Sequence, residues 1–233
     1  MYGYHDYVSV DKKRAKAQKE LEKRRKRDPN IAPVIIEGKK IAKTWWGVAW
    51  TKNLESYADY DNRVQRGRAY VKNGMVIDLR IYEGTVTAVV MGSSSPYQVE
   101  VMIDPLSENK WEELSAQCGQ KIDSLNALVE GRFPKELEKI FENSELFPTP
   151  KQITFDCTCF DYASMCKHVA AVLYAIGARF DEDPTLFFKL RGVNFSSLLK
   201  KSIDEKMQTM LENAQKKSER VIKDTDIETL FGL

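Results

Sequence analysis

Residues 153–168 read Ile-Thr-Phe-Asp-Cys-Thr-Cys-Phe-Asp-Tyr-Ala-Ser-Met-Cys-Lys-His and place three cysteines and one histidine within twelve residues. The pattern is Cys-x-Cys, six further residues, and Cys-x-His. Side chains two apart in a strand share a face, so Cys157 and Cys159 can bind one ion together. Two residues apart within a helix, Cys166 and His168 would diverge by roughly 200°. We therefore expect Cys166 to precede a helix and His168 to lie in its first turn.

Three thiolates and one imidazole complete a four-coordinate zinc shell and leave no position for water or substrate. The spacing predicts one structural zinc ion bound by Cys157, Cys159, Cys166 and His168. A chance cluster of small buried cysteines is the alternative. An iron–sulfur cluster fits histidine ligation and single-residue spacing poorly, and a redox pair would require Cys-x-x-Cys. Zinc with three thiolates carries a net charge of −1, which Lys167 is hypothesised to offset in part.

The segments around this motif predict an α+β fold. After the motif, a helix that is apolar on most sides is expected from Val169 to Phe180. Before it, hydrophobic residues recur with period two, and Asn73-Gly74 is typical of a β-hairpin turn. We predict a four-stranded antiparallel meander covered by helices, followed by a zinc-bound β-hairpin–helix and a C-terminal helix. The expected strands cover residues 68–72, 75–82, 85–90 and 97–103.

Helical spacing marks the covering elements. Residues 44–57 form an amphipathic pattern that Thr44 can cap, with Trp46 and Trp50 as core anchors in preference to base-stacking residues. A second pattern runs from Trp111 to Leu125 and includes Cys118 as a small core residue, and a shorter one follows Pro134. Apolar residues between 196 and 223 predict a helix that docks on the core or on a partner helix. A short apolar tail at 226–233 is a candidate contact peptide.

Composition indicates a globular protein without a membrane span. No apolar run approaches the roughly 20 residues that cross a bilayer, and the first residues lack the pattern of a signal peptide. We expect a cytoplasmic location. Residues 1–43 carry 13 Lys/Arg and 6 Asp/Glu, whereas the remainder carries 23 and 28. This division suggests a basic arm (1–43), an α+β domain (44–146), a zinc finger (147–195) and a C-terminal helix with tail (196–233).

The arm has two interpretations. Residues 11–27 are almost all charged, with Leu21 as their single large apolar residue, so we expect them to bury no stripe against a core. The first interpretation is a solvated, partly disordered helix. The second is a nucleic-acid-binding arm that becomes ordered on contact.

The ligand spacing resembles that of the SWIM-type zinc finger. The resemblance to bacterial SWIM zinc finger proteins extends over residues 41–195, through the segments 44–50, 66–71, 166–174 and 181–192, and includes Leu230-Phe231-Gly232. The family often has Pro after the second cysteine, where this chain has Phe160. The resemblance implies a module for binding DNA or protein, associated with Swi/Snf-type helicase-like ATPases. It is not tied to one chemistry, because related fingers occur in unrelated proteins.

These features favour a zinc-stabilised binding module or adaptor that serves a nucleic-acid machine. Candidate nucleic-acid contacts are Arg63, Arg66, Arg68 and Lys167, although charge at a solvated loop is the simpler explanation of the three arginines. The alternative is a protein–protein scaffold without nucleic-acid contact, favoured by the acidic balance after residue 43. An enzyme is not expected, because phosphate-loop, nucleophile-elbow and metalloprotease motifs are missing. No small-molecule substrate or membrane partner is inferred.

Overall fold

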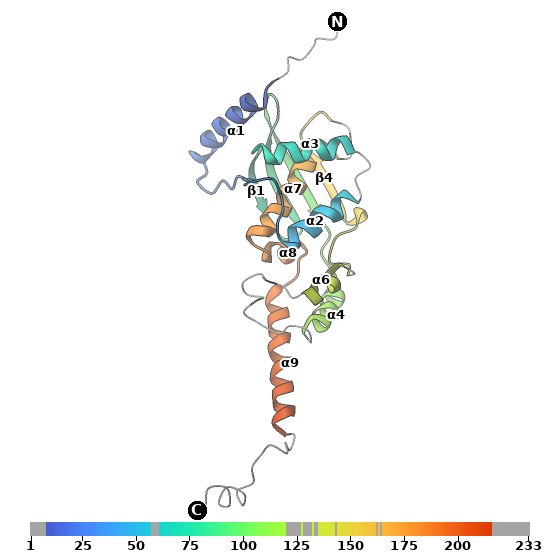
Figure 1. Cartoon of the computed structure of the whole chain (residues 1–233). Coiled ribbons are helices and arrows are strands. Elements are labelled where there is room, and N and C mark those ends of the chain that lie inside the picture. Colours follow the sequence, from blue (N-terminus) through green and yellow to red (C-terminus); the bar gives the residue numbers. More distant parts are fainter. Residues whose placement is uncertain are drawn as a thin grey trace, which may run out of the picture.

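The computed structural model describes residues 8–56, 61–119, 127, 132, 135–142, 144–161, 163 and 165–215 (Figure 1). Its strands are β1 (Val76–Ile81), β2 (Thr85–Met91), β3 (Pro96–Ile103) and β4 (Ile153–Cys157). The helices before β4 are α1 (Val10–Arg25), α2 (Trp45–Glu55), α3 (Asp61–Lys72), α4 (Glu108–Gly119), α6 (Lys135–Glu142) and the 3-10 turn η1 (Pro150–Gln152). Those after it are α7 (Lys167–Glu182), α8 (Thr185–Leu190) and α9 (Phe195–Gln215).

The strands form one antiparallel sheet in the order β1-β2-β3-β4, which confirms the α+β class. Val86, Val99 and Val101 are buried on the face covered by α7, while Thr87 and Glu100 are exposed on the other face. This alternation is expected of an antiparallel sheet that is covered on one side.

Helix α7 is the central element of the described structure. It contacts all four strands on one side and α2 and α3 on the other, so it forms the middle of three layers. Twelve of its sixteen residues are buried, which explains why its sequence is apolar on most sides. At its end, Asp181 accepts hydrogen bonds from the backbone and hydroxyl of Thr44 and so ties down the start of α2.

The predicted first strand, residues 68–72, is wrong, because these residues belong to helix α3. Asn73-Gly74 ends that helix instead of turning a hairpin. The amide of Gly74 donates to the carbonyl of Val71 at 3.0 Å, and the amide of Met75 donates to that of Tyr70 at 3.0 Å. This pair of bonds is the Schellman motif, which needs the positive φ of 69° that Gly74 adopts. Asn-Gly is common both in hairpin turns and at helix C-termini. The alternation of apolar and polar residues that marks a strand begins only after Gly74.

The fourth strand comes from the zinc segment. β4 pairs with β3, with Val101 opposite Phe155 and Val99 opposite Cys157. The predicted β-hairpin is therefore corrected: within the described residues, β4 has β3 as its partner and forms the edge of the main sheet. The sheet thus combines β1–β3 from the predicted α+β domain (44–146) with β4 from the predicted zinc finger (147–195). The boundaries between these segments stay predictions.

Helix α1 is docked, contrary to the expectation that residues 11–27 bury no stripe against a core. Ala17 and Leu21 are buried, at 2% and 7% exposure, one turn apart on the same side. Arg14 donates to the side-chain oxygen of Asn73 at 2.7 Å, and Lys16 donates to the carbonyl of Ser93 at 3.2 Å. Two buried apolar residues therefore dock this helix, together with the hydrogen bonds that Arg14 and Lys16 make to residues outside it.

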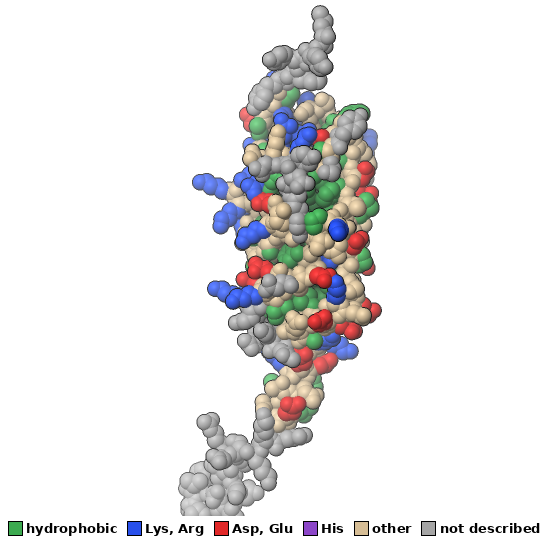
Figure 2. Space-filling model, turned by 90° about the vertical axis from the view of Figure 1, so that its right-hand side faces the viewer, with side chains coloured by type: hydrophobic (Ala, Val, Ile, Leu, Met, Phe, Trp, Pro, Cys, Tyr) green, Lys and Arg blue, Asp and Glu red, His purple; other side chains and the backbone are tan. Residues whose placement is uncertain are grey.

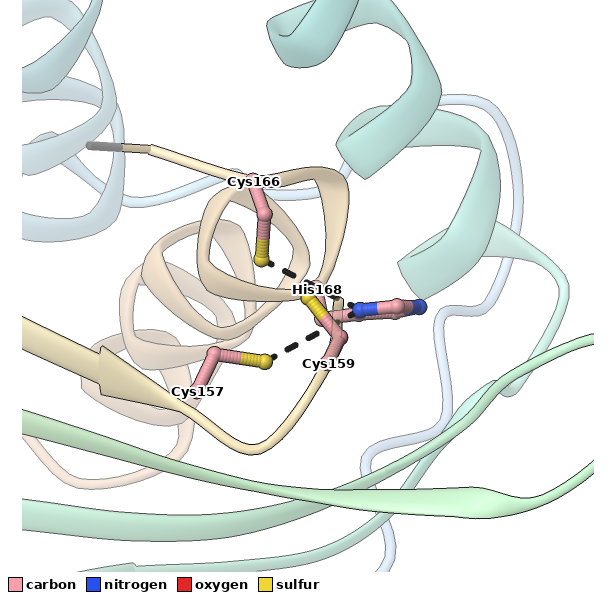
Figure 3. Close-up of side chains that lie close together, drawn as sticks. All are labelled: Cys157, Cys159, Cys166 and His168. Carbon is pink, nitrogen blue, oxygen red and sulfur yellow. Dashed lines mark hydrogen bonds between the residues drawn. The ribbon is translucent and has the colours of Figure 1, made fainter. Parts of the chain in front are cut away.

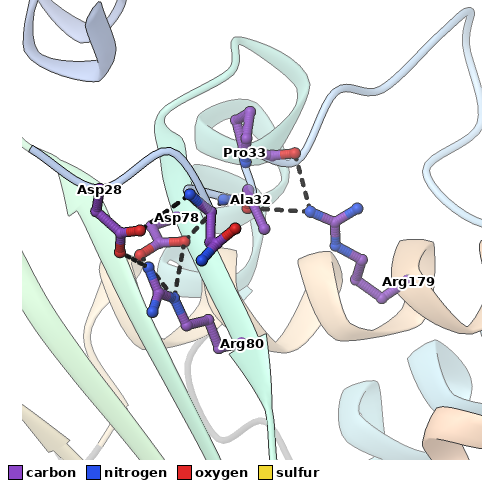
Figure 4. Close-up of polar contacts among 7 residues, drawn as sticks. Asp28, Ala32, Pro33, Asp78, Arg80 and Arg179 are labelled. Carbon is purple, nitrogen blue, oxygen red and sulfur yellow. Dashed lines mark hydrogen bonds and ion pairs between the residues drawn. The ribbon is translucent and has the colours of Figure 1, made fainter. Parts of the chain in front are cut away.

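The segment after α1 covers the free edge of β1 (Figure 4). Ala32 and Val34 exchange backbone hydrogen bonds with that strand, to Leu79 (2.9 Å) and Val76 (3.1 Å). Arg179 of α7 donates to the carbonyls of Ala32 and Pro33 at 3.0 and 2.9 Å. Unpaired strand edges promote aggregation, and this segment satisfies part of one.

Two carboxylates bind Arg80 beside that segment (Figure 4). Asp28 lies at the end of α1, and Asp78 lies on β1 and also accepts from the amide of Ala32 at 2.9 Å. The hydrogen bond from Arg80 holds the pKa of Asp28 below its ordinary value. Arg80 therefore connects the end of α1 to the sheet.

The other predicted helices are present where the structure describes them. Trp46 and Trp50 are core residues, at 2% and 0% exposure, and Cys118 is fully buried in α4. Tyr57, Ile122, Leu125, Pro134 and the tail 226–233 lie outside the described residues. Helix α9 buries Leu198 near its start, but its later apolar residues are exposed by 43–69%: Ile203, Met207, Met210 and Leu211. Among the described residues, no helix has the length and apolarity to span a membrane.

Gly67 tests the packing of α3 on α7. A Cβ on Gly67 would lie 2.5 Å from the Cβ of Ala170 and 2.8 Å from its carbonyl carbon, so the helices would have to separate. We predict that Gly67→Ala lowers the free energy of unfolding by about 1–2 kcal/mol, because overpacking outweighs the gain in helix propensity. Urea denaturation measures the change. Gln65→Ala, at an exposed site of the same helix, is expected to be near neutral, and equal stability of both variants would contradict this packing.

Candidate metal centre

The four predicted ligands converge from three local structures (Figure 3). Cys157 is the last residue of β4, Cys159 lies in the loop that follows, and His168 is in the first turn of α7. Cys166 is the N-cap of that helix, with φ −80° and ψ 168°, which confirms the extended geometry expected for it. Because Cys166 is not helical, its side chain and that of His168 can point to the same place, which they could not do if both residues were in the helix.

The distances fit a tetrahedral zinc ion. Nδ1 of His168 lies 3.9 Å from the sulfurs of both Cys157 and Cys166. All four ligand atoms lie within 4.8 Å of one another. Bonds of about 2.3 Å to sulfur and 2.0–2.1 Å to nitrogen place the ligand atoms of a tetrahedral site roughly 3.5–3.8 Å apart. A contraction of about 1 Å or less therefore completes the shell.

Thr158, between the first two ligands, fixes the Cys-x-Cys segment to the sheet. Its amide donates to the carbonyl of Gln98 at 3.1 Å, and its hydroxyl accepts from the amide of Gln98 at 3.0 Å. These two bonds prolong the pairing of β3 with β4 past Cys157. The residue between the two cysteines is thus held on β3 by two hydrogen bonds.

The start of α7 favours a thiolate at Cys166. The amide of Val169 donates to its sulfur at 3.4 Å, and the positive end of the helix dipole lies at the same place. Hydrogen bonding from Cys157, followed by that from His168, lowers the pKa of Cys166 to about 3. The same proton, shared between the two sulfurs, together with burial, raises the pKa of Cys157. Zinc displaces such protons, so metal affinity falls as pH falls.

The comparison with known families identifies this segment. Residues 155–177 match the SWIM zinc finger. The match covers all four ligands and the first part of α7. The SWIM finger therefore consists here of the sheet edge, the ligand loop and the start of the central helix, and it holds one structural zinc ion.

One curated relative extends the similarity beyond the finger. The chain is 36% identical over 163 residues to "Uncharacterized protein Rv2102" of Mycobacterium tuberculosis (strain ATCC 25618 / H37Rv). The alignment covers 68% of this chain and 58% of that protein, so the chain spans less than two thirds of its relative. No solved structure matches the chain.

Two of the four predicted nucleic-acid residues are engaged inside the protein. Arg63 lies on α3 and forms a bidentate ion pair with Asp161 of the ligand loop. The two guanidinium nitrogens lie 2.5 and 3.0 Å from the two carboxylate oxygens. Arg68, on the same helix, donates to the hydroxyl of Tyr174 at 2.7 Å and pairs with Glu55. The expected helix-to-strand loop for these arginines is wrong, since all of them lie on α3. Arg63 positions the finger's loop and Arg68 joins three helices.

Arg66 and Lys167 point to the surface near the finger. Arg66 is exposed on α3 and Lys167 is half-buried at the start of α7. The ammonium of Lys167 lies 5.9 Å from the ring centre of Tyr70. It also lines a hollow of about 580 Å³ beside the zinc site.

The residues that surround His168 are not indicated by any motif in the sequence. Its ring lies between Tyr70 of α3 (5.5 Å between ring centres) and Tyr97 of β3 (4.6 Å), and its Nε2 is buried without a hydrogen-bond partner among the described residues. Tyr70 falls in the predicted strand at 68–72, whereas in the structure it lies on α3, which packs on α7. Only a helical pattern recognised over residues 61–72 would have placed Tyr70 near His168.

Zinc content tests the ligand set. We predict that Cys159→Ala lowers zinc below one ion per chain and loosens the region after Phe147, because loss of a ligand removes a large part of roughly 10–16 kcal/mol of binding free energy. Atomic absorption and limited proteolysis measure the two effects. Cys118→Ala is the matched control, since Cys118 is buried in α4 outside the cluster, and it should retain one zinc ion. Full zinc content in the Cys159 variant would contradict the assignment.

Proposed function

We propose that this protein is a zinc-stabilised module that binds nucleic acid and serves a nucleic-acid machine such as a Swi/Snf-type helicase-like ATPase. The observation that carries the proposal is the docking of α1. This helix has eight Lys/Arg and three Asp/Glu in sixteen residues. Because Ala17 and Leu21 seat it on the core, its basic outer face is presented by the folded protein at a fixed place.

That place is connected to the zinc finger by direct contacts. Lys16 of α1 binds the carbonyl of Ser93 at 3.2 Å, and Arg14 donates to the side chain of Asn73, which directly follows α3, the helix that carries Tyr70. Tyr70 in turn packs against His168 and under Lys167. The basic helix, Arg66 and the front of the finger thus share one end of the molecule, which supports a single extended contact surface for a phosphate backbone.

The charge of the other faces supports the same orientation. On the open face of the sheet, Glu100 lies directly opposite Asp156, and both are exposed. Figure 2 views the molecule from the side away from α1, and most Asp and Glu side chains in this view lie on its right half. A polyanion is repelled by an acidic face and attracted to a basic one, so the two faces select one docking direction.

A second candidate function is a protein–protein scaffold without nucleic-acid contact. It is favoured by the exposed apolar stripe of α9, where Ile203, Met207 and Met210 share a face. Such a stripe suits a helix of a partner protein. In both candidates the protein acts by binding, since the closed zinc shell offers no position at which a water molecule could be activated.

Charge reversal on α1 tests the proposal. Lys19 and Lys23 are exposed one turn apart, opposite the buried face. We predict that Lys19→Glu with Lys23→Glu weakens binding to a labelled DNA duplex and lowers the slope of log affinity against log salt by about 2, because each lost phosphate contact removes close to one released counterion. Fluorescence anisotropy between about 50 and 200 mM salt measures both.

The matched control is Lys151→Glu with Lys200→Glu, which makes the same change of charge at exposed positions on η1 and α9. Affinity equal in the two double variants would show that net charge, and not the α1 surface, determines binding. Affinity that does not change with salt in the unmodified protein would contradict phosphate contact. Recovery of a helicase-like ATPase after nuclease treatment, without DNA binding, would favour the scaffold.

A further inference from the structure

We propose that Phe160, in the ligand loop of the SWIM finger, is a stacking platform for an unpaired base, so that the ligand of this surface is single-stranded nucleic acid. The inference rests on the proposed function and names its ligand class. Phe160 is 88% exposed, the highest exposure of any large apolar side chain in the described residues. An aromatic ring exposed to this degree has no part in the core and is available to a ligand.

The backbone on both sides of Phe160 is anchored. The preceding residue, Cys159, is a zinc ligand. The following residue, Asp161, is paired with Arg63 and accepts from the amide of Ala163 at 3.4 Å. A ring carried on a backbone fixed at two adjacent positions loses little conformational entropy when a flat partner covers it.

The surroundings of Phe160 provide the other contacts that a nucleotide strand requires. The ring borders the hollow of about 580 Å³ that Arg63, Tyr97 and Lys167 also line. Lys167 supplies a positive charge, and Tyr97 supplies a second aromatic ring. Arg66 is exposed on α3 three residues after Arg63, and Arg14 of α1 binds Asn73 at the far end of the same helix. This is the combination of an aromatic ring and a cationic track by which proteins bind single strands.

A duplex does not fit the same feature. Its base faces are covered by neighbouring base pairs, so Phe160 would meet sugar and phosphate and gain nothing from its ring. Stacking of one base on an aromatic side chain contributes about 1–3 kcal/mol by alanine substitution. The geometry therefore predicts a preference for single strands that depends on this ring, added to a phosphate attraction that both forms share.

The test compares Phe160→Ala with the unmodified zinc-loaded protein. Fluorescence anisotropy is measured with labelled oligothymidylate of about 16 nucleotides and with a duplex of equal length. We expect Phe160→Ala to weaken single-strand binding roughly 5- to 150-fold, to leave duplex binding within about twofold, and to retain zinc. Phe160→Trp should restore single-strand affinity. Tyr82→Ala, which removes an aromatic side chain that is 46% exposed just after β1, is the matched control and should change neither.

The outcomes separate this inference from the function on which it rests. If Phe160→Ala leaves single-strand affinity unchanged while the α1 double variant reduces it, the stacking role is overturned and the nucleic-acid module stands. Equal weakening of single-strand and duplex binding also overturns stacking. If the unmodified protein binds neither form at low salt, both proposals fail. Loss of a helicase-like ATPase partner in Phe160→Ala, without loss of nucleic acid, makes the ring a protein contact and overturns the inference.

Discussion

A metal shell that joins the sheet edge to the front of the central helix is the constraint on which the rest of this structure depends. Helix α7 contacts all four strands as well as α2 and α3, so its position sets the distance between the layers. The zinc ligands Cys157, Cys159, Cys166 and His168 connect the first turn of this helix to the end of β4. The free energy of such a site, about 10–16 kcal/mol, is comparable with the stability of a whole domain, about 5–15 kcal/mol. The finger is thus an internal brace of the fold as well as part of its surface.

The sequence predicts the zinc site better than the fold around it, for a physical reason. Metal ligation restricts residue types and spacing so strongly that twelve residues define the ligands, and even the extended geometry of Cys166 follows from the divergence of side chains in a helix. Strand pairing has no such local code. The sheet has four antiparallel strands as expected, but β4 replaces the predicted strand at 68–72. Asn73-Gly74 is compatible with a hairpin and with a helix C-cap, and only tertiary contacts decide between them.

Surface charges were the least predictable part of the candidate site. Arg63 and Arg68 look equivalent to Arg66 in the sequence, yet both have acidic partners on other elements: Asp161, 98 residues from Arg63, and Glu55, 13 residues from Arg68. Helix α1 shows the opposite error, since two modest apolar residues dock a segment whose composition favours solvent. Gly67, between Arg66 and Arg68, lies where α3 packs so closely on Ala170 of α7 that a Cβ would not fit.

The attachment of α1 to the sheet, at the segment that joins α1 to β1, depends on ionic strength. The end of α1 is attached to the sheet through Arg80 and Asp28, a pair that water reaches, and mobile ions screen such pairs. The hydrogen bonds from Arg179 to the carbonyls of Ala32 and Pro33 are less affected, because these two acceptors are neutral. Rising salt therefore weakens one of the contacts that hold α1 on the sheet. Under the proposed function, the affinity of α1 for nucleic acid should then decline more steeply with salt than a count of its lysines and arginines would indicate.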